Sequence, residues 1–161
     1  MKLARHGLGV EIPRGWDARI YRRAADQAGS TTRAVMHAAN FALPERREDY
    51  GGGAVEIMRT GDVLLMLLEF DPEAAATPLF AHQGLPRRLS PSAFAPNRLQ
   101  RILPGQAGAQ FFFSDAGRAW CLYVVLGSWA DRARLAAQAE RILASTSLER
   151  LAGTTPGEAA P

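Results

Sequence analysis

Cysteine, lysine and long apolar runs are all scarce in this sequence. Cys121 is the only cysteine, so the chain cannot close a disulfide within itself. It has no continuous run of about 18 apolar residues, so we expect no helix that spans a bilayer. The start of the chain carries Lys2 and Arg5 but no apolar core or small-residue cleavage site, so it does not look like a secretory signal. Together these absences predict a protein of the bacterial cytoplasm.

The composition that remains is typical of a folded globular domain. Of the 161 residues, 47% are hydrophobic and 22% are charged, unlike a disordered, collagen-like or disulfide-rich chain. A chain of this length buries roughly two thirds of the surface it exposes when unfolded, so it needs no metal or disulfide to fold. We expect one domain over residues 1–150, followed by a disordered tail over residues 151–161.

Almost all of the positive charge comes from arginine. The formal net charge is +3, and Lys2 is the sole lysine among 19 basic residues. The arginines are interleaved with acidic and apolar residues, and no block of five or six like charges occurs. Zinc-finger spacing, a basic zipper and an aromatic RNA-binding motif are also missing. The sequence therefore argues against nucleic-acid binding, whereas scattered arginines are well suited to contacts with a protein partner.

Short alternating or fully apolar runs predict an antiparallel sheet. We expect three hairpins, in which residues 10–12 pair with 17–23, 54–59 with 63–70, and 110–113 with 118–126. The second strand of the middle hairpin and both strands of the last are apolar on both faces, which predicts central positions in the sheet. Two further strands are predicted over residues 35–43 and 99–103.

A single amphipathic helix is predicted near the end of the domain. Ser128 is the expected N-cap, and residues 129–146 place Leu135, Ala139, Ile142 and Leu143 on one face. A single helical turn is expected after Asp71, residues 24–32 are expected to form a loop, and prolines interrupt residues 79–106. The fold class is therefore α+β, with an antiparallel β-sheet and a long C-terminal amphipathic helix packed on it.

Both ends of the domain resemble one known family. The run VEIPRGW at residues 10–16 resembles the first strand and turn of the PsbP-like and Mog-like superfamily, which includes actinobacterial proteins of unknown function. The run GRAWCLYVVLG at residues 117–127, followed by an amphipathic helix, looks like the closing strand and helix of that family. The resemblance implies an antiparallel sheet between helices and a non-enzymatic role in binding or assembly. It supplies no catalytic residue, and residues 24–33 lack the long helix of the family pattern.

The residues that most often carry chemistry show no catalytic or metal-binding pattern. His6, His37 and His82 lack metal-ligand spacing, and no Gly-x-Ser-x-Gly elbow is present. Cys121 lies among large apolar neighbours, which is typical of a buried core thiol with a raised pKa. We therefore predict no catalytic residue, no metal and no cofactor.

The segment over residues 94–110 is the richest candidate for recognition. Its arginines and uncharged amides suit hydrogen bonding to a peptide or a polar ligand, although such amides can equally satisfy the segment's own backbone. Arginine is also common among residues that dominate protein interfaces. With the loop over residues 79–88, the candidate binding residues are Arg87, Arg88, Arg98, Gln100, Arg101 and Gln106.

These features favour a non-enzymatic binding or scaffold protein that acts through protein–protein contacts, as an accessory of a larger envelope-associated or secretory assembly. The alternative is a small-molecule-binding protein or minor enzyme with a pocket between sheet and helix, where His37 or His82 would meet carboxylates. A homo-oligomer formed through an exposed strand edge is a third hypothesis.

Overall fold

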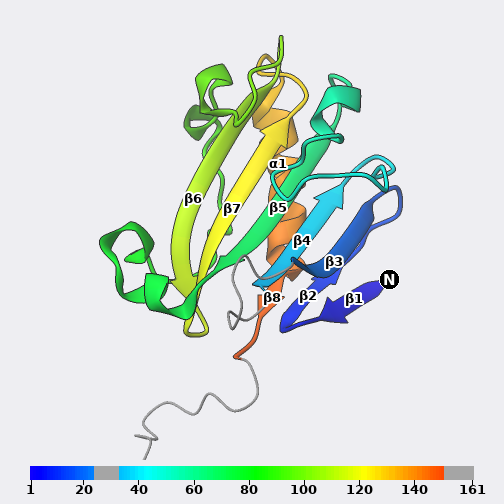
Figure 1. The fold of residues 1–161 in the computed structure, drawn as a ribbon. Coiled ribbons are helices and arrows are strands. Elements are labelled where there is room, and N and C mark those ends of the chain that lie inside the picture. Colours follow the sequence, from blue (N-terminus) through cyan, green and yellow to red (C-terminus); the bar gives the residue numbers. More distant parts are fainter. Residues whose placement is uncertain (24–32, 151–161) are drawn as a thin grey trace, which may run out of the picture.

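Two antiparallel sheets and one α-helix make up the described part of the chain (Figure 1). The computed structural model describes residues 1–23 and 33–150, so the predicted loop over 24–32 and tail over 151–161 lie outside the described residues. The main sheet has five strands in the order β3–β4–β5–β7–β6. Their bounds, in that order, are Asp17–Arg23, Arg33–Ala39, Val63–Phe70, Arg118–Leu126 and Ala107–Asp115.

The second sheet contains three short strands in the order β1–β2–β8. Their bounds are Lys2–Arg5, Leu8–Glu11 and Ser147–Leu148. The predicted hairpin between residues 10–12 and 17–23 is therefore wrong, because β2 pairs with β1 and β8 while β3 pairs with β4. A tight turn at His6 (φ 53°) and Gly7 (φ 76°) folds β2 back onto β1. One edge of β2 is therefore already paired with β1.

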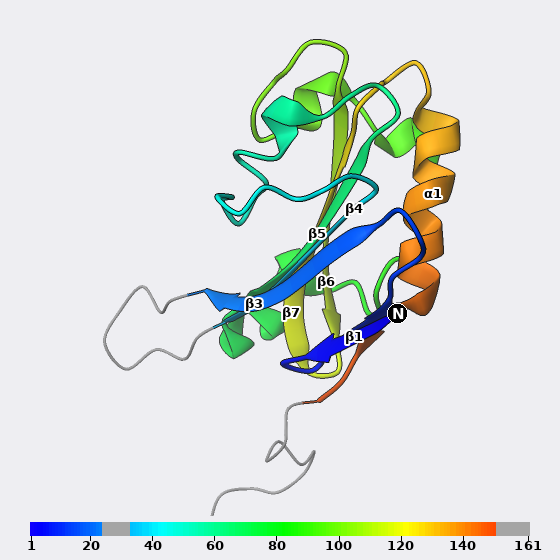
Figure 2. The same cartoon turned by 90° about the vertical axis from the view of Figure 1, so that its right-hand side faces the viewer.

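The α-helix α1, Arg132–Ser145, covers one face of the main sheet, as the side view shows (Figure 2). The predicted apolar face is confirmed, because Leu135, Ala139, Ile142 and Leu143 are all buried. The helix begins three residues later than predicted, since the turn between Ser128 Oγ and the Asp131 N–H precedes it and Trp129 stays exposed. Among the described residues, no helix is both long and apolar enough to cross a membrane.

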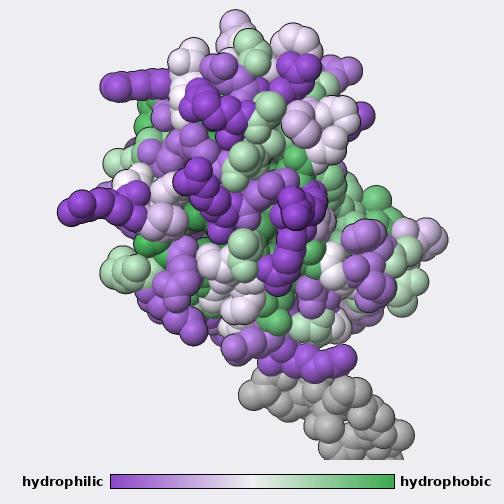
Figure 3. All heavy atoms as spheres, turned by 180° about the vertical axis from the view of Figure 1, so that it is seen from behind, coloured by the Kyte–Doolittle hydropathy of each residue, from purple (hydrophilic) through white to green (hydrophobic). Residues whose placement is uncertain are grey.

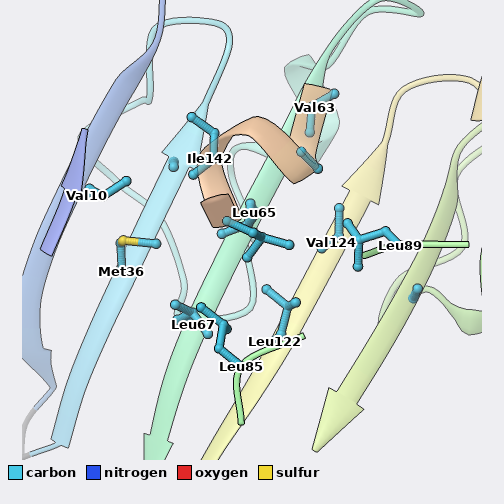
Figure 4. Close-up of a cluster of buried hydrophobic side chains, with 14 of the residues drawn as sticks. Val10, Met36, Val63, Leu65, Leu67, Leu85, Leu89, Leu122, Val124 and Ile142 are labelled. Atoms are coloured by element: carbon cyan, nitrogen blue, oxygen red, sulfur yellow. The ribbon is translucent and has the colours of Figure 1, made fainter. Parts of the chain in front are cut away.

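Strands β5 and β7 are buried on both faces, which confirms their predicted central position. On the α1 side, Met36, Leu65, Leu67, Leu122 and Val124 form a core that Leu85 and Leu89 complete from the chain before β6 (Figure 4). On the opposite face, Leu64, Met66, Leu68, Tyr123 and Val125 pack beneath irregular segments that include Leu43, Val55 and Leu99. Strand β6 was also predicted to be central, but it ends the sheet.

Two predicted strands are absent from the structure. Residues 54–59 contain the 3₁₀ helix η1, Val55–Ile57, because Gly51 (φ 87°) and Gly53 (φ 93°) turn the chain sharply before it. Residues 99–103 are irregular, and the Gln100 N–H donates to the Tyr123 hydroxyl rather than to a neighbouring strand. The remaining 3₁₀ helices each begin at a proline and are η2 Pro72–Ala76, η3 Pro78–Phe80, η4 Pro91–Ala93 and η5 Pro96–Arg98.

Candidate functional site

Two neighbouring clefts lie beside β6, the last strand of the main sheet. The first cleft, of about 630 Å³, lies between residues 82–88 and the side chains of Phe111 and Phe112. The second cleft, of about 460 Å³, lies between residues 97–100 and the side chains of Gln110 and Phe112. Phe112 lines both clefts, so we treat them together as one candidate site. Phe111 packs against the core on the α1 side, whereas Phe112 packs against the core on the opposite face.

The outer wall of the first cleft is held in place by its backbone. The Leu85 N–H donates to Asp115 Oδ2 at 2.9 Å, and the Leu89 N–H donates to Glu140 Oε1 on α1 at 2.7 Å. The side chains of Leu85 and Leu89 are buried beneath the segment. This wall is therefore a fixed part of the fold, and ligands would meet a cleft that is already formed.

The predicted residues Arg87 and Arg88 both line the first cleft but have different local roles. Arg87 donates from Nη1 to the carbonyl oxygens of Leu143 and Thr146, so it satisfies acceptors at the C-terminal end of α1. Arg88 is exposed, and its side chain has no hydrogen-bond or ion-pair partner within the described part of the chain. Arg88 is thus the more available of the two for a partner.

Two more predicted residues, Arg98 and Gln100, line the second cleft. Arg98 is exposed and donates to the Ala93 carbonyl oxygen at 2.7 Å, which positions its guanidinium group beside the cleft. The amide side chains of Asn97, Gln100 and Gln110 also line this cleft, and in the described chain none of them has a hydrogen-bond partner. These amides therefore fit the recognition hypothesis.

The structure places Arg101 and Gln106 away from both clefts. Arg101 forms an exposed ion pair with Glu56 at 2.8 Å. Gln106 is buried and donates from Nε2 to the Val55 carbonyl oxygen at 2.8 Å, while its Oε1 has no partner among the described residues. These two side chains tie the segment before β6 to η1. For Gln106, the alternative that the amides bond within the fold is the one that applies.

His37 belongs to a buried polar network that lies elsewhere in the sheet. Its Nδ1 accepts a 2.9 Å hydrogen bond from Arg47 Nε, and since arginine can only donate, the proton of the neutral ring lies on Nε2. That Nε2 is 2.9 Å from the Asp49 carbonyl oxygen, to which it donates. Burial lowers the pKa of His37 to about 4, so the ring is neutral near pH 7. The network anchors the loop that carries Arg47 and Asp49 to β4.

The remaining chemistry-bearing side chains do not assemble into a reactive site. Cys121 is fully buried, as its sequence neighbours predict, and burial raises its pKa to about 12. His82 lines the first cleft, but neither cleft is lined by a carboxylate from the described residues. Within the same part of the chain, no cluster of three His, Cys, Asp or Glu side chains could hold a metal ion. Neither of these two clefts is therefore the histidine–carboxylate pocket of the alternative hypothesis.

Phe111 and Phe112 are the site residues that the sequence prediction missed. They were expected to lie in a central strand, whereas β6 ends the sheet and leaves both rings half-buried. Gln110 is the signal that could have revealed this, because a polar side chain directly before three phenylalanines indicates a surface that is not fully covered.

No family model matches the chain, and no curated protein or solved structure matches it. The resemblance to the PsbP-like and Mog-like superfamily therefore stays a prediction. The described residues agree with the broader expectation of an antiparallel sheet with a C-terminal helix packed on one face.

Proposed function

We propose that this protein is a non-enzymatic binding protein whose partner protein docks on the two clefts beside β6. The observation that carries the proposal is the shared position of Phe112, a half-buried ring that lines both clefts, with Arg88 and Arg98 exposed beside it. Interfaces between proteins are enriched in aromatic and arginine side chains, which supply much of their binding free energy. The side-chain amides of Asn97, Gln100 and Gln110, which have no partner among the described residues, add hydrogen-bonding capacity.

The positions of the titratable groups favour binding over catalysis. His37, Tyr21 and Cys121 have strongly shifted pKa values, and burial is the main cause for each of them. Strongly shifted groups mark an active site when they face a cleft, but none of these three lines either cleft. The shifted pKa values of these three groups are explained by their burial within the fold.

The cellular setting is a further part of the proposal. The resemblance at residues 10–16 and 117–127 supports a PsbP-like or Mog-like sandwich and a role in assembly. The proposed setting is the cytoplasm, where the protein would serve a larger envelope-associated or secretory complex. Under this proposal the partner is a protein subunit of that complex.

Affinity capture with matched variants tests the proposal. Three forms of the protein are immobilised and incubated with lysate of the native host. They are the wild type, the double variant Arg88→Ala/Arg98→Ala and the control Arg132→Ala/Arg134→Ala on α1. We expect a protein that the wild type and the α1 control retain and the cleft variant loses, and titration with that purified protein should reproduce the difference. The proposal fails if no retained protein depends on Arg88 and Arg98, or if native mass spectrometry finds a small molecule in the first cleft instead.

A further inference from the structure

Between the two clefts, the outer edge of β6 contains a stretch of backbone that no other described residue pairs with. At one end, Gly108 exchanges two 3.1 Å hydrogen bonds with Ala95. At the other end, the Ser114 N–H donates to the His82 carbonyl oxygen, and the Ser114 carbonyl oxygen accepts from the Gly84 N–H, each at 2.8 Å. Both ends of the edge are therefore covered by the chain that precedes β6 (Figure 1).

Gln110 and Phe112 lie between these two covered ends. In an antiparallel pair, the N–H and C=O groups of alternate residues point to the same side of the strand. The backbone N–H and C=O groups of Gly108 and Ser114 point away from β7, so those of Gln110 and Phe112 do as well. The backbone groups of Ala109, Phe111 and Phe113 point toward β7. No described residue bonds to the outward N–H and C=O groups of Gln110 and Phe112. We call residues 110–112 the open edge.

The two clefts lie where the side chains of an added strand would point. Successive side chains of a strand alternate between the two faces of a sheet. Phe111 belongs to the face that carries α1, and Phe112 belongs to the opposite face. A strand beside the open edge would therefore direct alternate side chains toward the first cleft and toward the second cleft. Backbone groups would supply affinity, and the clefts would supply specificity.

The length of the open edge limits its occupant to a short segment. From Gly108 to Ser114 the strand rises about 20 Å, at roughly 3.3 Å for each residue. The chain at Ala95 and at residues 82–84 already occupies the two ends of that distance. About five residues of an extended peptide fit between them, rather than a long strand from a folded sheet.

The charges at the clefts define the chemistry of that peptide. Arg87, Arg88 and Arg98 line the clefts, and within the described chain no carboxylate does. The apolar part of the surface comes from Leu85, Phe111 and Phe112. Acidic side chains at the ends and β-branched or aromatic side chains between them would complement this surface.

A second copy of this chain is a poorer occupant for the same reason. Antiparallel pairing of two open edges would bring Arg88 and Arg98 of one copy close to the same arginines of the other. Like charges that meet at an interface oppose association.

Figure 3 shows the molecule from behind the view of Figure 1, on the face that carries α1. Hydrophilic and hydrophobic residues are interspersed on this face.

From these observations we infer that the open edge of β6 binds a short, extended, acidic peptide segment of a partner protein by strand addition. The inference rests on the proposed function and specifies how the partner is held. Gln110 and Phe112 would exchange backbone hydrogen bonds with the segment, while its alternate side chains enter the two clefts.

Substitution of Gln110 gives a direct test of the backbone bonds. Gln110→Pro removes one outward N–H and no bond to β7, and proline is tolerated on edge strands. Gln110→Ala removes the same side chain but keeps the N–H, so it is the matched control. The probes are displayed peptides of about seven random residues. We expect enriched sequences with acidic and β-branched residues that bind Gln110→Pro about tenfold more weakly than they bind Gln110→Ala, since these two variants lack the same side chain and differ in the backbone N–H.

A second measurement does not depend on the folding of the proline variant. Each backbone nitrogen of an enriched peptide is methylated in turn and the binding to the wild type is measured. Strand addition predicts strong losses at alternate positions, where the methyl group replaces a bonded N–H, and small losses between them. Equal losses at all positions, no loss, or no enriched acidic peptide would overturn the inference.

The two proposals fail in different ways. If the captured partner depends on Arg88 and Arg98 but binds Gln110→Pro and Gln110→Ala equally, strand addition is wrong and the cleft surface remains the binding site. If binding of the partner is unaffected by Arg88→Ala/Arg98→Ala and is the same for Gln110→Pro and Gln110→Ala, the proposed function is wrong as well. A dimer by light scattering that Gln110→Pro abolishes would identify a second copy as the occupant and would overturn the peptide inference.

Discussion

Arg118 and Glu69 form a buried ion pair on the neighbouring strands β7 and β5, with Arg118 Nε 2.7 Å from Glu69 Oε2. The same guanidinium group donates to the carbonyl oxygens of His6 and Glu149, and it lies 4.5 Å from the ring centroid of Trp120. Glu69 also accepts the Ala34 N–H at 3.0 Å. The pair thus joins the main sheet to the turn between β1 and β2 and to the residue that follows β8.

Glu69→Gln should strongly destabilise the fold, because it leaves the buried Arg118 charge without its carboxylate. The expected loss in the free energy of unfolding is about 3–5 kcal/mol, measured by urea denaturation. The control Arg134→Gln removes one partner of an exposed pair with Asp131 and should cost less than about 1 kcal/mol. Equal losses in the two variants would show that the Arg118–Glu69 pair is not a structural link.

His37 should make the stability depend on pH below neutrality. Its pKa is about 4 in the folded protein against an ordinary histidine value of 6.5, so between these values the unfolded chain binds a proton that the folded protein does not. The contribution of neutral His37 is complete above about pH 6.5 and is lost as the pH falls toward 4, at up to about 1.4 kcal/mol for each pH unit. Unfolding of His37→Gln across this range should show a shallower slope than the wild type, and parallel slopes would contradict the assignment.

Cys121 should react slowly with thiol reagents in the native protein. Its thiol is fully buried, and burial raises its pKa to about 12, so little thiolate exists near pH 8. A colorimetric disulfide reagent should modify it at least about 100-fold more slowly than free cysteine in native buffer. In denaturant the two rates should become similar. Rapid modification of the folded protein would show that this part of β7 opens readily.

Gly127 should not tolerate a side chain. A Cβ at this position would lie 1.8 Å from the carbonyl oxygen of Arg59 and 3.2 Å from that of Asp62, so the backbone would have to move. Gly127→Ala should lower the stability by more than about 2 kcal/mol, measured as a shift in the urea midpoint. Gly61→Ala is the control, because nothing lies within 4 Å of its added Cβ. A Gly127→Ala midpoint close to that of Gly61→Ala would show that the turn can relax.

The parts of the fold that were predicted correctly are those that depend on local pattern. Residues 63–70 and 118–126 are apolar on both faces, and they form β5 and β7, each of which has a neighbouring strand on both sides. The apolar face of α1 follows directly from helical spacing at Leu135, Ala139 and Ile142. Such patterns reflect burial of the segment itself and need no knowledge of its partners.

The errors concern pairing and backbone conformation between distant residues. The partner of β2 is set by the turn at Gly7 and by β8, a strand of two residues that has no recognisable pattern. Among the candidate site residues, Arg88 and Arg101 look alike in the sequence, yet Arg101 pairs with Glu56, which is 45 positions away. Local sequence cannot show which arginine has a partner, so only the folded chain separates the two.

The pairing of Leu8 with Leu148 has a consequence for how the domain is synthesised. On a ribosome the strand β2 emerges before β3 to β7, whereas its neighbours α1 and β8 emerge after them. Until then the buried side chains of Leu8 and Val10 have no complete surface to cover them. The β1–β2 hairpin must therefore wait, with apolar groups facing water, until nearly the whole domain has been translated. Chaperone capture of nascent chains would fall within this interval.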